Sequence, residues 1–140
     1  MSGSSKVLMF AVLALLLAGA ADARTTSTVI GTGGVYPNSG EKLLYAQASA
    51  SHPASLSTKV ITSPGQKVIL KWAVSCGLGT AVGENEDPTT KQNSNQKTVT
   101  SPATVPLALP LAHPKTCSIS VYAYLTKKAN ATAKLLVLQG

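Results

Sequence analysis

The side chains that could support catalysis are few in this sequence and stand far apart. The chain has two histidines, His52 and His113, and only five acidic residues among 140. Each histidine precedes a proline, which predicts extended or turn backbone around it. A serine–histidine–aspartate arrangement is defined by geometry rather than by sequence order, so it stays open. Because neither a nucleophile-elbow motif nor a zinc-binding histidine–glutamate helix motif occurs, we expect no enzymatic activity and no cofactor.

Most of the acidic residues fall in one long polar segment, residues 77–96. Glu84, Glu86 and Asp87 lie close together there. Calcium takes clustered oxygen ligands, so these carboxylates are a weak candidate metal site, although their spacing matches no established loop motif. Long loops in compact domains are often functional or disordered. The segment is therefore either a functional loop or a solvated one.

A strip of hydroxyl-bearing side chains is the strongest candidate binding site. In the run 117–126 the outward residues are serines, Tyr122, Tyr124 and a threonine, and Lys127 and Lys128 follow. Tyrosine and serine beside lysine form a flat, hydrogen-bonding surface of the kind used for sugars or protein partners. Tyrosine is also favoured in strands for its packing alone. The candidate binding residues are Tyr122, Tyr124, Lys127 and Lys128.

The chain is basic, with a formal net charge of +7. Such a surface favours anionic partners, such as acidic polysaccharides, phosphate polymers or anionic lipids. The single arginine is Arg24. Because base-specific readers of nucleic acid depend heavily on arginine forks, we expect no sequence-specific nucleic-acid binding. Lysines that only keep strand edges soluble would give the same charge.

Two alternating runs place the cysteines. Cys76 ends the run 67–76 and Cys117 begins the run 117–126, and each falls on the apolar side of its period-two pattern. Both thiols should therefore point into the core and join in an oxidising compartment. Closing a loop of about 40 residues should stabilise the fold by about 4 kcal/mol. We expect this bridge to cross the core between two sheets.

The first 23 residues are typical of a signal peptide. Lys6 precedes an apolar run, and Ala21 and Ala23 supply small residues at the two positions that signal peptidase reads. The run would span about 18 Å as a helix, against about 30 Å of hydrocarbon core, so we expect no transmembrane anchor. Residues 24–140 would then form a single secreted or periplasmic domain. Asn130 lies in a glycosylation sequon, which matters only if the host glycosylates.

The periodicity of residues 24–140 predicts strands. The candidates are 26–32, 42–49, 56–62, 67–76, 97–101, 105–111, 117–126 and 132–138. The run 42–49 is rich in alanine, so a helix is the alternative there. The glycine-rich stretch 31–34 is not followed by a phosphate-binding lysine and predicts a turn. The pattern predicts an all-β two-sheet sandwich of seven to eight short antiparallel strands with one disulfide.

Prolines recur at intervals of four through the run 105–111 and its flanks. Pro102, Pro106, Pro110 and Pro114 would remove N–H donors from one edge of an extended segment. Val105, Leu107, Leu109 and Leu111 fall on the opposite side-chain face and could cover the core. This pattern favours a protected edge strand. A proline-rich ligand for a groove-binding partner is the alternative.

The bridge between two alternating strands resembles immunoglobulin-like domains in part. Trp72 lies four residues before Cys76 on the same face, whereas antibody-type domains carry the tryptophan between the cysteines. Lys115 and Thr116 precede Cys117, where those domains place a tyrosine two residues before the second cysteine. The architecture is therefore expected to be immunoglobulin-like, with no family assigned.

These observations favour a secreted, non-catalytic binding or structural protein. Its partner would be an anionic surface polymer or another secreted protein, held by the tyrosine strip or by the acidic loop. The alternative is a small secreted effector, a hydrolase or a protease inhibitor, acting through residues 77–96. The oligomeric state stays open.

Overall fold

The computed structural model describes residues 27–79 and 90–140, and all regular structure within them is β-strand. The eight strands are β1 (Thr28–Val35), β2 (Leu43–Ser51), β3 (Leu56–Ile61), β4 (Lys67–Gly77), β5 (Lys91–Thr100), β6 (Ala103–Leu107), β7 (Thr116–Leu125) and β8 (Lys134–Gln139). Each predicted run corresponds to one of them. The all-β class is confirmed, and the alanine-rich run is strand β2 rather than a helix.

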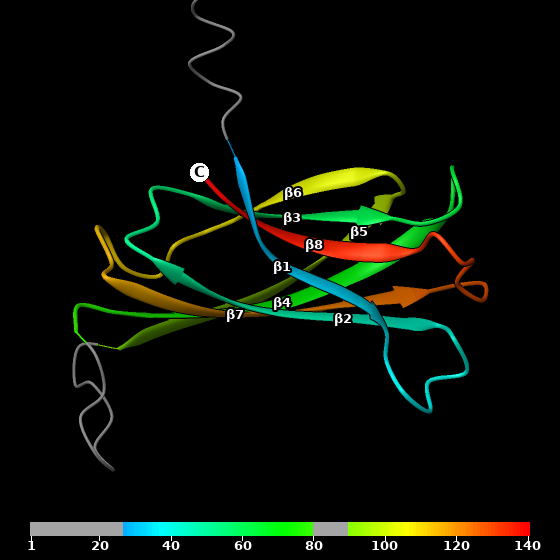
Figure 1. The fold of residues 1–140 in the computed structure, drawn as a ribbon, viewed down its shortest axis with the longest axis horizontal. Coiled ribbons are helices and arrows are strands. Elements are labelled where there is room, and N and C mark those ends of the chain that lie inside the picture. The colour runs from blue at the N-terminus through cyan, green and yellow to red at the C-terminus, as the bar shows by residue number, and fades with distance from the viewer. Residues whose placement is uncertain (1–26, 80–89) are drawn as a thin grey trace, which may run out of the picture.

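The strands form one antiparallel sheet in the order β5-β4-β7-β2-β1-β8-β3-β6 (Figure 1). β1 joins its two halves, because Gly34 and Val35 pair with β2 while residues 28–33 pair with β8. The edge strands β5 and β6 follow each other directly along the chain, so the sheet closes almost completely on itself. The architecture is thus a nearly closed, barrel-like sheet, where two separate sheets were predicted.

Glycines allow β1 to cross between the halves. A Cβ atom on Gly33 would collide with the carbonyl oxygen of Tyr45, and one on Gly31 would lie 2.8 Å from the carbonyl oxygen of Gln47. Close approach of two backbones is a site where only glycine fits. The glycine-rich stretch therefore belongs to a strand, and the prediction of a turn there is wrong.

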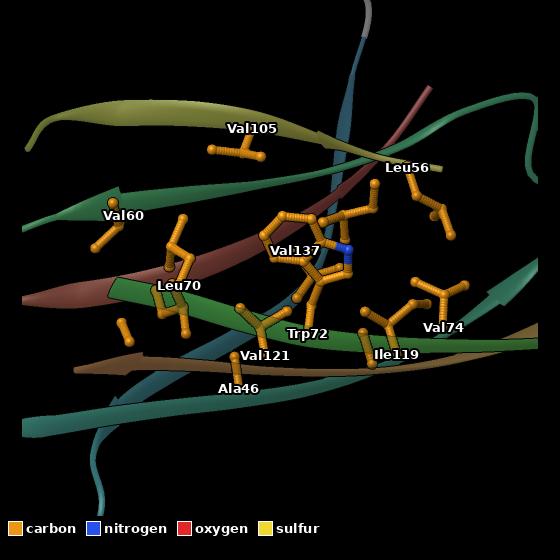
Figure 2. Close-up of a cluster of buried hydrophobic side chains, with 14 of the residues drawn as sticks. Ala46, Leu56, Val60, Leu70, Trp72, Val74, Val105, Ile119, Val121 and Val137 are labelled. Carbon is orange, nitrogen blue, oxygen red and sulfur yellow. The ribbon is translucent and has the colours of Figure 1, made fainter. Parts of the chain in front are cut away.

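The core lies between the two halves of the folded sheet. On β4 buried and exposed residues alternate, which confirms the period-two pattern. Figure 2 shows side chains from β3, β6 and β8 meeting those from β2, β4 and β7. The largest fully buried side chains are Leu44, Leu70, Ile119, Leu135, Val60, Val68, Val74, Val121 and Val137. β1 and β5 contribute none of the buried apolar residues.

The disulfide Cys76–Cys117 is present, but it lies within the sheet rather than across the core. β4 and β7 are neighbours, and the two cysteines are direct cross-strand partners with 4.1 Å between their Cα atoms. Such a short distance is typical of non-hydrogen-bonded antiparallel pairs. A period-two pattern fixes the face on which a side chain lies but not its neighbouring strand. The prediction of a bridge between two sheets was therefore wrong.

The proline-spaced segment supplies an edge strand, as predicted. β6 ends the sheet and pairs only with β3 among the described strands. Val105 and Leu107 are buried, and Leu109 and Leu111 pack against the core from beyond the strand. The strand itself stops at Leu107, four residues before the predicted end.

Replacement of Gly33 by alanine should destabilise the protein. The added methyl group has no space beside Tyr45, and overpacking of this kind typically costs about 1–3 kcal/mol. Urea denaturation of Gly33→Ala should show this loss. The matched control is Gly34→Ala, because nothing lies within 4 Å of the added Cβ there. Equal stability of the two variants would contradict the close crossing of β1 over β2.

The double variant Cys76→Ala/Cys117→Ala should lose about 2–5 kcal/mol of unfolding free energy, because its unfolded chain is no longer constrained. Urea denaturation of the variant and of the oxidised protein would measure the difference. Alkylation of the protein unfolded in urea should add no mass before reduction and two alkyl groups after it, because both cysteines are buried in the folded state and are joined in the bridge. A free thiol in the unreduced protein would disprove the bridge.

Candidate binding face

The outward residues of β2, β4 and β7 form one continuous face. The sheet register places Leu43, Tyr124 and Ile69 in one row across these strands. The next row contains Tyr45, Tyr122 and Lys71. Tyr36, which follows β1, contacts Tyr45 from the far side. All four tyrosines of the chain therefore gather here, and we name Tyr36, Tyr45, Tyr122, Tyr124, Ile69 and Lys71 the tyrosine face.

Ring contacts fix the arrangement of this face. The Tyr36 and Tyr45 rings meet edge to face, with 5.7 Å between their centroids and an interplanar angle of 80°. The Tyr45 and Tyr122 centroids are 4.8 Å apart. Lys71 Nζ lies 5.1 Å from the centroid of the Tyr124 ring, within the range of a cation–π contact. Aromatic pairs in these geometries stabilise one another, so the face is organised before any ligand arrives.

Much of the tyrosine face is accessible to solvent. Tyr36 is 45% exposed, and Tyr124 and Ile69 are each 41% exposed. Tyr45 and Tyr122 lie between them and are half-buried. Contiguous exposed aromatic and aliphatic groups on a soluble domain commonly mark an interaction surface.

Small polar residues continue the same face toward the other end of the strands. Their rows are Ser94, Ala73, Ser120 and Gln47, followed by Gln92, Ser75, Ser118 and Ser49. No large side chain interrupts these rows. The face is therefore aromatic at one end and rich in hydroxyl and amide groups at the other, and a shallow cavity of about 320 Å³ lies where Lys71 meets Ser94 and Gln96.

The charge around this face is almost entirely positive. Only Lys6 and Arg24 of the twelve basic residues lie outside the described parts of the chain. Glu41 is the only acidic residue within those parts, and it lies in the turn before β2. The described part of the chain therefore carries a positive net charge, and Lys71 and Lys67 present this charge on the outward side of β4.

The four predicted binding residues lie at two different places in the structure. Tyr122 and Tyr124 lie on the tyrosine face. Lys127 lies beyond the end of β7, where its carbonyl accepts a hydrogen bond of 3.2 Å from Gln66 Nε2, and Lys128 follows it. Lys127 also lines a shallow cavity of about 330 Å³ with residues 63–67 and Thr126.

Sequence reasoning missed Tyr36, Tyr45, Ile69 and Lys71. Three of these residues lie on strands that are distant in sequence from β7, and only the pairing order brings them beside it. Alternation in the runs 42–49 and 67–76 already placed Tyr45 and Lys71 on outward faces. That signal could have nominated them, but it could not have shown that the faces join.

Extended or turn backbone was predicted at the histidines, and both lie in bends between strands with left-handed backbone. The φ angles of His52 and His113 are 49° and 50°. Ser51 Oγ lies 3.1 Å from His52 Nδ1, beside a cavity of about 380 Å³ that Gly79, Lys115 and Thr116 also line. Glu41, the only described acid, lies at the opposite end of β2, so no described residue supplies the acid of a triad at this place.

The predicted loop 77–96 is shorter than expected. β5 begins at Lys91, so the last six residues of the predicted loop belong to a strand that is paired with β4. These residues are polar on both faces, and without hydrophobic alternation their sequence gives no strand signal. Glu84, Glu86 and Asp87 lie outside the described residues. Within residues 27–79 and 90–140, no group of three or more histidine, cysteine, aspartate or glutamate side chains could hold a metal ion.

Two further findings bear on classification. The described part of the chain contains no helix long and apolar enough to cross a bilayer. Neither a protein-family model nor a curated protein matches the chain.

Proposed function

We propose that this chain is a secreted, non-catalytic binding protein whose tyrosine face takes an anionic surface polysaccharide. The observation that carries this proposal is the gathering of four tyrosines and Lys71 on one solvent-accessible face. The exposed rings offer apolar surfaces for sugar rings, and their hydroxyl groups can donate and accept hydrogen bonds. Lys71 can neutralise a carboxylate or sulfate on the polymer.

The shape of the face favours a polymer over a small molecule. Sites for small ligands are typically concave and enclose most of the ligand. Here the rows of outward side chains run from the aromatic end across serine and glutamine residues, so an extended chain could contact several rows at once. The large excess of lysine over acidic residues draws a polyanion toward this surface.

The proposed function also requires that the chain be exported. Cleavage after Ala23 would release the domain into an oxidising compartment, where the Cys76–Cys117 bridge is stable. We also propose that the halves of the sheet on either side of β1 correspond to the two layers of an immunoglobulin-like sandwich. Asn130, the acceptor of the predicted sequon, is exposed in the turn before β8 and is open to modification.

The protein should bind immobilised polygalacturonate, a linear acidic polysaccharide, at about 150 mM salt, while a neutral dextran matrix should not retain it. Tyr122→Ala should weaken binding by about tenfold, which corresponds to about 1.4 kcal/mol, because a ring contact is lost without a change of charge. Surface plasmon resonance would measure the dissociation constants of the wild type and the variants.

Two lysine variants provide the matched control. Lys71→Ala and Lys134→Ala remove the same charge, but Lys134 begins β8 in the other half of the sheet. Lys71→Ala should weaken binding more. Equal losses for both variants, with no effect of Tyr122→Ala, would reduce the interaction to general charge attraction and overturn the proposal.

The alternative of a secreted hydrolase draws on the contact between Ser51 and His52. Under the proposed function, a fluorophosphonate probe should not label the full-length protein. Labelling that disappears in both Ser51→Ala and His52→Ala would replace the binding proposal with an enzymatic one. Binding to polygalacturonate should be the same in these two variants as in the wild type.

A further inference from the structure

One side of the edge strand β5 is not paired with any described strand, and a single side-chain hydrogen bond of 3.0 Å, from Asn93 Nδ2 to the carbonyl of Ala108, links β5 to the segment that follows β6. β5 pairs with β4 along its whole length from Lys91 to Thr100, and it stands at the end of the sheet order (Figure 1). No other described strand is paired with it. A strand at the edge of a sheet offers a row of backbone N–H and C=O groups to an additional strand.

The hydrogen bonds identify the groups that point outward. The N–H of Gln96 donates to Asn95 Oδ1 at 2.8 Å, so it faces away from β4. Alternate residues of a strand share the same direction, which gives Gln92, Ser94 and Thr98 outward N–H groups as well. A second hydrogen bond leads to the same assignment. The Lys115 N–H donates to the Gly77 carbonyl, so the backbone groups of the preceding residue, Cys76, point toward β5. Lys91 pairs with Cys76, so its backbone groups point toward β4 and those of the next residue, Gln92, point outward.

The two edges of the sheet are built differently. β6 is five residues long and carries Pro106, which has no N–H to donate. β5 is ten residues long, has no proline, and keeps one register with β4 from end to end. Short strands, prolines and lysines are the usual protection against strand addition, and β5 has only the lysines, Lys91 and Lys97.

The positive charge of β5 indicates what kind of strand could pair with this edge. Lys91 and Lys97 lie on the same face of β5, and the strand carries no acidic residue. A second copy of this chain would bring lysine-bearing edges and two basic bodies together, so self-pairing is disfavoured. A strand with acidic side chains six residues apart on one face could instead pair with both lysines.

We propose that the β5 edge binds an extended segment of a partner protein by strand addition, and that the segment carries acidic side chains opposite Lys91 and Lys97. Main-chain hydrogen bonds to Gln92, Ser94 and Thr98 would supply affinity, and the lysines would supply selectivity. This edge contains none of the six residues of the tyrosine face, although the Gln92 and Ser94 side chains lie in the polar rows that continue that face.

A synthetic peptide tests the proposal. The probe is a labelled nine-residue peptide of threonine and valine with glutamate at its second and eighth positions, and its binding is followed by fluorescence anisotropy. Ser94→Pro removes an outward N–H group without removing a bond to β4 and should weaken binding by about tenfold. The matched control Ser94→Thr keeps the N–H group and should bind as the wild type does.

Four further measurements complete the test. Urea denaturation should show that Ser94→Pro is folded, whereas Asn93→Pro, whose N–H group points toward β4, should be clearly less stable. A peptide with glutamine in place of glutamate should bind about tenfold more weakly. Tyr122→Ala should leave peptide binding unchanged, which separates this site from polysaccharide binding. Equal peptide binding by Ser94→Pro and the wild type, or dimerisation of the wild type in sedimentation, would overturn the proposal.

Discussion

The pairing of β4 with β7 is the constraint on which the rest of the structure depends. Cys76 and Cys117 are direct partners at one end of this pair, and the register continues without a break to Val68 and Leu125. A slip of one residue would turn every side chain of a strand to the opposite face. By locking two buried cysteines opposite each other, the bridge keeps Trp72 in the core and Lys71 on the surface.

The same register produces the tyrosine face. Tyr122 stands between Lys71 of β4 and Tyr45 of β2, and none of these residues would meet if β7 lay elsewhere in the sheet. A face built on the interior strands of a sheet is held by hydrogen bonds on both sides, so its rings are positioned by a rigid support. Binding through this face would therefore require little reorganisation.

The two edge strands of this nearly closed sheet, β5 and β6, differ in how much of the core they cover and in how they are protected. β1 crosses between the halves at Gly31 and Gly33, which lets the inward faces of the two halves pack against each other. β6 covers part of the core through Val105 and Leu107 and is protected by its proline. β5 buries almost nothing, and its polar composition allows it to stand at an open edge.

Period-two alternation by itself determined most of the secondary structure: all eight strands, the inward cysteines and the outward Tyr122 and Tyr124. The signal is local, since it depends on side chains two residues apart along one strand. It failed where a strand had no apolar face, as in the first half of β5, and where glycines replaced side chains, as at Gly33. Only the tertiary structure decided which strands are neighbours, because strand order depends on contacts between distant segments. That order placed the disulfide within the sheet, brought Tyr36, Tyr45 and Lys71 beside Tyr122, and left Lys127 and Lys128 at the end of β7.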